Sequence, residues 1–350
     1  MKDVLISIIM PVFNAEKYLE KSIKSVLNQT FENFEFIIIN DNSTDKSEIS
    51  IKHFSEKDPR IKYIENVNKG VSNARNLGID ISIGKYITFI DADDYICNNT
   101  LEKMYSYINE SSNDICMAGY VEESENKKIK IELPYKDKEI LDKLQIKLNI
   151  IPKMIAITKN DNDKNLIMGS VCRLLIRRKI IEENNIKFNS KVYLAEDLLF
   201  CIEVFLKANT IIIMKECYYS YIRYGNTTLE KYRENFLEES LFFYNEYEQL
   251  LRKLKIFNEN KERFYTSKCS MYTTAISNYF RYDSPKNHKK RKQGIKGIIK
   301  VCNSDCSLKK NYTNNISFMK KVAFKLIKCN RISFLILFFS IKEKIRRHKI

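Results

Sequence analysis

The stretch Lys85-Tyr86-Ile87-Thr88-Phe89-Ile90-Asp91-Ala92-Asp93-Asp94 combines a short apolar run with a cluster of carboxylates. The apolar run predicts a buried strand over residues 85–90 that ends at Asp91. Because alternate residues of an extended segment point the same way, Asp91 and Asp93 are able to share one ligand. An Asp-x-Asp triplet alone is more often a solvated acidic turn, so its interpretation depends on the surrounding sequence.

Apolar strands and amphipathic helices alternate along residues 5–90. Pro11 is expected to close the first strand, Ser43 or Thr44 to cap the second helix, and Gly84 to close the third helix. This alternation predicts an α/β fold of βαβ units around a mostly parallel, Rossmann-like sheet, in which ligands bind beyond the carboxyl ends of the strands. The expected strands are 5–10, 34–39, 61–64 and 85–90, and the expected helices are 15–27, 45–54 and 72–83.

The pattern changes after Ile115, where shorter elements follow one another. The remainder after Thr228 is rich in Tyr, Phe, Lys and Glu and is expected to be mostly helical. Between these points we expect a hairpin strand at 127–133, helices at 140–151 and 195–208, an apolar and basic segment at 167–179, and two adjacent strands at 211–214 and 218–223.

The composition fits a chain of 350 residues that folds as one large domain or two ordinary ones. The nine cysteines are odd in number and form no Cys-x-x-Cys pair, which indicates reduced thiols in a cytosolic protein. Cys302 and Cys306 could bind a metal, but the chain has only three histidines and we expect no zinc site. The sequence runs from Met1 into the first strand, so we expect no cleavable leader and a cytoplasmic location.

The net charge of +16 is concentrated in the C-terminal tail. Residues 285–350 carry 19 Lys and Arg against Asp305 and Glu343, a balance of +17, whereas the rest of the chain is close to neutral. The apolar run 332–341 lies between basic residues but is shorter than the roughly 20 residues that span a bilayer. It predicts a helix at an anionic membrane surface, and the alternative is a helix packed on the domain with a solvated basic face. No zinc finger, RNA-recognition sequence or helix-turn-helix is visible, so no nucleic-acid partner is expected.

Further polar and aromatic residues follow the expected strand ends or begin the expected helices. Asp41 can accept a hydrogen bond from a base N–H or belong to a helix N-cap box. Phe13 brings a ring beside the same crevice, with core packing as the alternative. Arg75 suits a phosphate, with a structural salt bridge as the alternative. Glu196 and Asp197 begin a helix, where carboxylates interact favourably with the dipole.

Together these segments make the chain resemble the inverting family-2 glycosyltransferases with the A-type fold, in particular bacterial enzymes of capsule, exopolysaccharide and other surface-glycan assembly. Five motifs in the same order within about a hundred residues make the resemblance specific. It extends to 169–175 and 195–200 on the acceptor side and fades after Thr228. The five N-terminal segments that carry it are 7–14, 25–30, 40–45, 72–78 and 91–94.

The resemblance implies a nucleotide-sugar donor site formed by residues of several of these segments. Asp41 is expected to contact the base, most often uracil, and Phe13 to lie near that base. Arg75 is expected near the donor phosphates. Pro11 and Asn14 belong to the same donor-binding segment.

The resemblance also implies a metal site and a catalytic base. Asp93 is expected to be the main ligand of Mn²⁺ or Mg²⁺, with Asp91 close to the metal or the donor ribose and Asp94 in a structural role. Asp197 is expected to remove the proton of the acceptor hydroxyl, with Glu196 beside it on the acceptor side.

The resemblance thus predicts an inverting, metal-dependent glycosyltransferase that moves a sugar, most often from a UDP-sugar, to a saccharide or lipid-linked saccharide acceptor. It implies a catalytic domain over 1–228, with a nucleotide-sugar-binding half (1–115) and an acceptor-side half (116–228). Beyond the resemblance, the residue pattern predicts a helical, basic extension over 229–350 at the inner face of the membrane. One alternative is a nucleotidyltransferase, which would usually carry a glycine-rich, basic phosphate loop after the first strand. The other is a catalytically inactive nucleotide-sugar-binding protein of the same fold.

Overall fold

The computed structural model describes residues 4–110, 112–125, 127–159, 161, 166–223, 231–281, 283–284, 287–308 and 312–347. Its strands are β1 (Ile6–Val12), β2 (Phe34–Asn40), β3 (Ile61–Glu65), β4 (Tyr86–Phe89), β5 (Tyr95–Ile96), β6 (Ile115–Ser124), β7 (Lys127–Ile131), β8 (Ile140–Asp142), β9 (Leu174–Arg177) and β10 (Thr210–Ile222).

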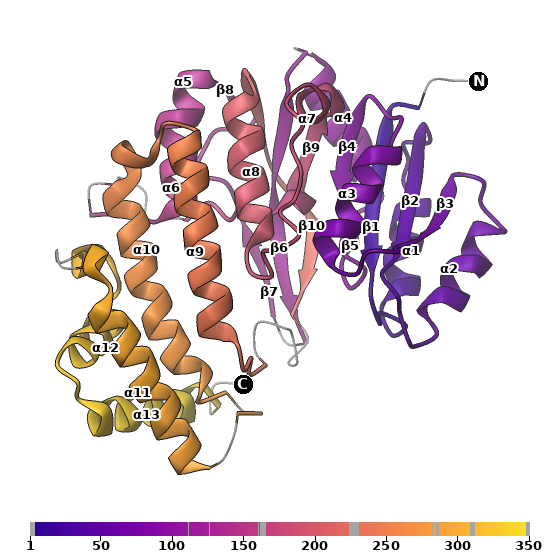
Figure 1. Cartoon of the computed structure of the whole chain (residues 1–350). Coiled ribbons are helices and arrows are strands. Elements are labelled where there is room, and N and C mark those ends of the chain that lie inside the picture. The colour runs from indigo at the N-terminus through magenta and orange to yellow at the C-terminus, as the bar shows by residue number, and fades with distance from the viewer. Residues whose placement is uncertain are drawn as a thin grey trace. The chain divides into compact units, whose positions relative to one another are not determined.

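These strands form one ten-stranded sheet within the described residues, in the order β3-β2-β1-β4-β9-β6-β10-β5, with β7 beside β6 and β8 beside β10 (Figure 1). β3, β2, β1 and β4 are mutually parallel. β9 runs against both of its neighbours, so β6 and β10 share the direction of the first four strands. The α/β fold with a mostly parallel sheet is therefore confirmed.

The strand order reverses at β1, and this reversal sets the place of the site. Helix α3 (Val71–Ile81) follows β3 and packs on β1 and β2 before the chain returns to β4 on the other side of β1. Gly78 permits the close packing, because a Cβ there would lie 2.5 Å from Cγ2 of Ile9. Open α/β sheets bind their ligands beyond the carboxyl ends of the strands at such a reversal, which here are the ends of β1 and β4.

Two strand boundaries differ from expectation. β1 continues through Pro11 to Val12. The strand tolerates proline there because Pro11 lies beyond Phe89, the last residue of β4, so the amide proton that Pro11 lacks is not needed to pair with β4. Gly84 does not close α3 in a left-handed conformation, since α3 has already ended at Ile81. Gly84 instead allows a close approach, because a Cβ there would lie 2.5 Å from the amide nitrogen of Ser7.

The first two helices also begin differently from expectation. α1 (Leu19–Leu27) begins after Ala15, whose amide donates to Oγ of Ser47 at 2.9 Å. α2 (Ser47–Ser55) has no cap from Ser43 or Thr44. Its first amide donates to the carboxylate of Asp45 at 2.9 Å, so a neighbouring carboxylate takes the place of the expected hydroxyl.

In the second half of the sheet, the expected hairpin strand is confirmed as β7, and the helix expected at 195–208 as α8 (Glu196–Lys207). Residues 140–142 form β8 instead of helix, and a capping box at Asp142 begins the helical turns α5 (Lys143–Gln145), a π segment (Ile146–Ile150) and α6 (Ile151–Ile155). The two strands expected over 211–223 are one strand, β10, with irregular register between Met214 and Tyr219.

The chain divides into two compact units, Met1–Ile151 with Ile167–Tyr224, and Pro152–Leu166 with Gly225–Ile350. The expected boundary after residue 228 lies outside the described residues, and the expected division after residue 115 falls at the start of β6. The second unit is helical, as expected. It contains α9 (Phe236–Lys253), α10 (Phe257–Asn278), α11 (His288–Ser304), α12 (Phe318–Lys328) and α13 (Ile332–Arg347), and Figure 1 shows α9 beside α10.

The segment 152–166 joins the second unit through a bidentate ion pair that the sequence pattern did not predict. Arg263 on α10 donates to both carboxylate oxygens of Asp161, at 2.8 and 2.6 Å, and to the carbonyl of Ala156 at 2.5 Å. Over the part of the chain that the structure describes, no helix has both the length and the apolar composition needed to cross a bilayer.

Candidate active site

Polar residues gather beyond the carboxyl ends of β1, β2 and β4 in the first unit. Asp41 follows β2 and is buried. Its carboxylate accepts hydrogen bonds from Nδ2 of Asn66 at 2.7 Å and from the amide of Gly70 at 2.9 Å. Gly70 has φ of 113°, a conformation that favours glycine, and it stands directly before α3. The loop between β3 and α3 therefore holds the Asp41 carboxylate in a fixed orientation at the end of β2.

The segment after β1 exposes an aromatic ring. The Phe13 side chain is 61% exposed, so the core-packing alternative is wrong. Asn14 next to it adopts φ of 48° and accepts a hydrogen bond on Oδ1 from the amide of Thr44 at 2.7 Å. Its own amide donates to Oγ of Ser43 at 3.1 Å. Asn14 thus ties the end of β1 to the loop after β2, while Pro11 stays buried within β1.

Arg75 on α3 joins three carboxylates that lie far apart in the sequence. Its Nη2 donates to Asp91 at 3.0 Å, and its Nη1 donates to Glu196 at 3.0 Å and to Asp197 at 2.5 Å. The Arg75 side chain is buried, and its guanidinium lies 5.3 Å from the centre of the Phe188 ring. The salt-bridge alternative therefore holds for Arg75, and the structure brings the turn after β4 together with the start of α8.

Three carboxylates around one guanidinium leave an excess of negative charge. Burial disfavours the charged form of Arg75, but the charges of Asp197 and Asp91 raise its pKa well above the ordinary value. Burial raises the pKa of Asp197 to about 7, with Arg75 opposing this shift and Glu196 and Asp91 adding to it. A carboxylate with such a pKa is suited to accept a proton near neutral pH.

The three carboxylates after β4 have different surroundings. Asp94 is buried, accepts from the hydroxyl of Tyr219 at 2.5 Å and from the amide of Ile222 at 2.8 Å, and burial raises its pKa to about 8. Asp93 is exposed, and partial desolvation together with the charge of Asp91 raises its pKa to about 6. Asp94 thus holds the turn against β10, while Asp93 faces outward.

This arrangement fits a hard divalent cation bound with help from a ligand. No cluster of three or more His, Cys, Asp or Glu side chains able to hold a metal occurs among the described residues. Mg²⁺ and Mn²⁺ need only one or two carboxylates, because waters and phosphate oxygens complete their coordination. Asp93 and Asp91 are close enough for one charge to shift the pKa of the other, and Asp91 uses Oδ1 for Arg75. Asp93 with the second oxygen of Asp91 is a donor set of the required kind.

Comparison with known proteins decides the family. Residues 7–183, slightly more than half of the chain, match the family model described as Glycosyl transferase family 2. The chain belongs to glycosyl transferase family 2. This glycosyltransferase is 30% identical over 266 residues to the cholesterol galactosyltransferase of Borreliella burgdorferi, an alignment that covers 74% of the chain and 72% of that relative.

Two further similarities cover most of the glycosyltransferase. The uncharacterized glycosyltransferase EpsJ of Bacillus subtilis is 28% identical over 251 residues, which are 69% of this chain and 70% of EpsJ. The crystal structure of Staphylococcus aureus TarS 1–349 in complex with UDP-GlcNAc superposes with a TM-score of 0.59 at 19% identity, covering 99% of this chain and 92% of that one. At this identity the likeness to TarS shows the shared fold.

Several residues of the site in this glycosyltransferase were not predicted from its sequence. Tyr219 on β10 donates to Asp94 and accepts from the amide of Asp91 at 3.3 Å, and no local pattern marks it. Ala195, directly before Glu196, adopts a left-handed conformation with φ of 56°, which is rare for a residue with a Cβ. Such strained residues cluster at functional sites. Asn76 gives one weak signal in the sequence for these long-range contacts. Its side-chain amide makes reciprocal hydrogen bonds with the backbone of Phe188.

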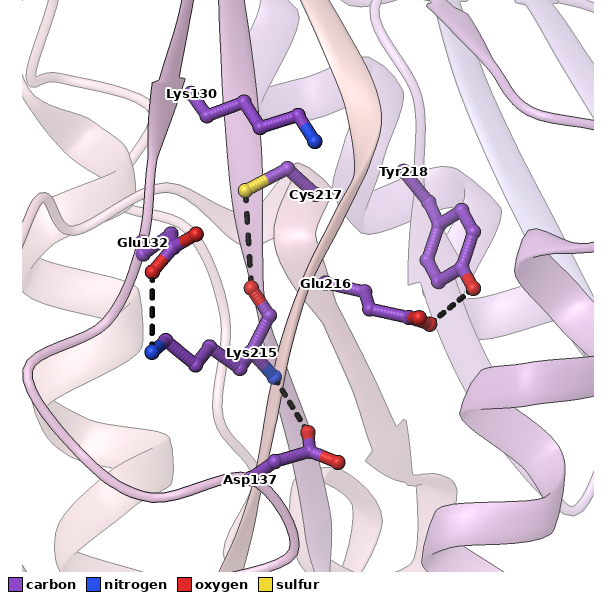
Figure 2. Close-up of a pocket in the computed structure, with 7 residues that line it drawn as sticks. All are labelled: Lys130, Glu132, Asp137, Lys215, Glu216, Cys217 and Tyr218. Atoms are coloured by element: carbon purple, nitrogen blue, oxygen red, sulfur yellow. Dashed lines mark hydrogen bonds and ion pairs between the residues drawn. The ribbon is translucent and has the colours of Figure 1, made fainter.

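A cavity of about 420 Å³ lies on the same unit of the glycosyltransferase but contains none of the predicted site residues. Figure 2 shows that Glu132, Asp137 and Glu216 each have a partner within the lining. Lys215 binds Glu132 through Nζ at 3.2 Å and Asp137 through its amide at 2.9 Å, and Tyr218 donates to Glu216. The cavity surrounds the irregular part of β10, and we assign no chemistry to it. Its lining residues are Lys130, Glu132, Asp137, Lys215, Glu216, Cys217 and Tyr218.

Proposed function

We propose that this glycosyltransferase moves a sugar with inversion from a nucleotide-sugar donor to a saccharide or lipid-linked acceptor, using Asp197 as the base. The observation that carries the proposal is the Arg75 cluster. One guanidinium binds Asp91, next to the expected donor, and Asp197, the expected base, within 3.0 Å of each. An inverting transfer needs its base and its leaving group positioned relative to each other, and a buried arginine shared by both segments supplies this coupling.

The donor in this proposal is a UDP-sugar. The exposed ring of Phe13 and the fixed carboxylate of Asp41 lie at neighbouring strand ends. A ring can stack on a nucleobase, and a carboxylate can accept from a base N–H, as uracil N3 provides. The crystal structure of TarS, which shares the fold, contains UDP-GlcNAc, and this supports a UDP-sugar as the class of donor.

The chemistry assigns one step to each acidic segment. Asp197 accepts the proton of the acceptor hydroxyl while that oxygen attacks the anomeric carbon, and the bond from this carbon to the diphosphate breaks. Arg75 orients Asp197, whose Oδ2 also accepts from the amide of Val171 at 3.4 Å. Asp93 and Asp91 would hold Mg²⁺ or Mn²⁺, which neutralises the charge that develops on the leaving diphosphate. Glu196 lies beside the base on the same guanidinium and belongs to the acceptor side.

The acceptor in this proposal belongs to bacterial surface glycans, on a saccharide or a lipid-linked saccharide. The cholesterol galactosyltransferase of Borreliella burgdorferi, which is 30% identical to this chain, is named for a lipid acceptor, and this supports the lipid-linked class. A surface-polymer acceptor carried on a lipid presents a hydroxyl of the same chemistry.

A donor screen tests the proposal. The full chain is incubated with a panel of UDP-, GDP- and dTDP-sugars and with Mg²⁺, Mn²⁺ or EDTA, and released nucleotide is identified by chromatography. We expect release of nucleoside diphosphate from one UDP-sugar, loss of this activity with EDTA, and an inverted anomeric configuration of the product by NMR. Asp93→Ala should abolish metal-dependent donor binding, whereas Glu56→Ala, an exposed carboxylate outside the site, should not. Release of pyrophosphate, or a product with retained configuration, contradicts the proposal.

A further inference from the structure

The last helix of the second unit, α13, exposes an apolar stripe. The stripe consists of Phe334, Leu337, Ile341 and Ile345, which are 60%, 58%, 49% and 54% exposed. Their spacing of three or four residues places them on one face of the helix. Isolated exposed apolar residues are ordinary, but a continuous row along a helix marks a surface that has a partner.

The opposite face of α13 is anchored in the second unit. Leu335 is fully buried and Phe339 is 3% exposed. The ring of Phe339 stacks on Phe280, with 5.7 Å between the centroids. The alternative from the sequence, a helix packed on its domain, is therefore correct for this face. It does not account for the apolar stripe, which points away from the anchored side.

Basic residues border the apolar stripe. At about 100° per residue, Lys342 lies on one edge of the stripe and Lys344 on the other, and both are exposed. Residues 318–347, which span α12 and α13, contain nine Lys and Arg and a single acid, Glu343. Lys320 of α12 is near Lys342, since its burial and then the charge of Lys342 lower its pKa. The apolar stripe therefore lies in a strongly positive surface.

We propose that the apolar stripe of α13 docks on the surface of an anionic lipid bilayer, with the helix lying in the plane of the membrane. The apolar side chains would enter the acyl boundary, while Lys342 and Lys344 extend to the headgroups. Positive charge without an apolar stripe would equally suit nucleic acid, and an apolar stripe without charge would suit a second copy of the chain. The combination favours anionic lipid. This inference does not rest on the proposed function, although it would bring the enzyme to membranes that carry lipid-linked acceptors.

Vesicle co-sedimentation of the full chain tests the inference. Sucrose-loaded vesicles of phosphatidylcholine with phosphatidylglycerol are compared with vesicles of phosphatidylcholine alone, without donor or metal. We expect binding to the anionic vesicles only. Leu337→Ser with Ile341→Ser should weaken this binding about tenfold, because two inserted side chains lose their apolar contact. Lys342→Ala with Lys344→Ala should weaken it roughly thirtyfold at low salt.

Matched controls come from the first unit. Ile49 is 68% exposed, and Ile49→Ser removes an apolar side chain that lies outside the apolar stripe. Lys57→Ala with Lys103→Ala removes two exposed positive charges from elsewhere. Both controls should bind the anionic vesicles within twofold of the wild type. Circular dichroism and elution volume confirm that the stripe variants remain folded.

Three results would overturn the inference. The first is unchanged vesicle binding by Leu337→Ser with Ile341→Ser. The second is a wild-type dimer that the same substitutions convert to a monomer with no vesicle binding in either form, which would assign the stripe to a second copy. The third is binding of short RNA but not of anionic vesicles. The two proposals fail separately, because the stripe variant should keep donor hydrolysis and Asp197→Asn should keep vesicle binding.

Discussion

Arg75→Met removes the guanidinium from the carboxylate cluster while leaving the apolar part of the side chain. Removal of one partner from a buried ion pair costs about 3–5 kcal/mol, because the other charge stays buried without compensation. The side chains of Asp91, Glu196 and Asp197 keep 33%, 16% and 19% of their exposure, so water compensates in part. We therefore expect the low end, a loss of about 3 kcal/mol in the free energy of unfolding at pH 7.5.

Urea unfolding followed by circular dichroism measures this loss, and scanning calorimetry should show a midpoint lower by about 6–12 °C for a unit of this size. Lys187→Met is the matched control. It breaks the exposed Lys187–Asp80 pair, whose side chains are 35% and 60% exposed, and should cost less than about 1 kcal/mol. Asp197→Asn in the Arg75→Met background should restore part of the stability, because the two substitutions are coupled.

The pH dependence of Arg75→Met has a definite sign. Without the guanidinium, the pKa of Asp197, which burial already raises, rises further above its unfolded value. A carboxyl group with a raised folded pKa contributes stability below its unfolded pKa and loses that contribution as pH rises through the folded pKa. The difference from the wild type should therefore shrink between pH 7.5 and pH 5. A loss under about 0.5 kcal/mol at pH 7.5, or a difference that grows toward pH 5, refutes the assignment of Arg75 as the charge that holds this cluster together.

Three further predictions concern the neighbours of this cluster. Tyr219→Phe removes the hydroxyl shared by Asp94 and the amide of Asp91, so the donor KM should rise about tenfold or more with a smaller change in kcat. An unchanged KM would argue against a positioning role for Tyr219. Because the pKa of Asp197 is about 7, kcat/KM should level off above pH 7 and fall about tenfold per pH unit below it; a flat profile down to pH 5 would remove Asp197 as the base. Ala195→Gly removes the Cβ that makes a φ of 56° unfavourable, and should raise the free energy of unfolding by about 1 kcal/mol in urea titrations. Destabilisation would show instead that this Cβ makes a necessary contact.

The first half of the fold could be predicted because its signals are local. β2 and β4 are nearly unbroken apolar runs. Asp41 directly follows β2, and Asp91 follows β4 after one further apolar residue, Ile90. A strand that is apolar throughout has to be covered on both faces, which implies helices on both sides of the sheet. The position of Asp41 and Asp91 at strand ends followed from that pattern alone.

The second half resisted prediction because its structure depends on distant partners. The sequence pattern divides residues 211–223 into two strands, whereas the structure has one strand, β10, with an irregular register. This irregularity arises in the pairing of β10 with β6, so no local pattern indicates it. The contact of Tyr219 with Asp94 bridges 125 positions of the chain, so no periodicity contains it. The sequence also did not predict that Arg75 and Asp197 bind each other. They lie far apart in the chain, and each had a local explanation that was sufficient by itself.

The role of Asp197 as the base is tested most directly by the rate of sugar transfer by Asp197→Asn, with donor affinity measured separately. If Asp197 is the base and Arg75 links it to the donor-side turn, the variant should bind the donor with an unchanged Kd and transfer sugar about 10²–10⁴-fold more slowly. Glu196→Gln, which alters the neighbouring carboxylate on the same guanidinium, should lose far less. Transfer by Asp197→Asn within tenfold of the wild type, at full donor occupancy, would exclude Asp197 as the base.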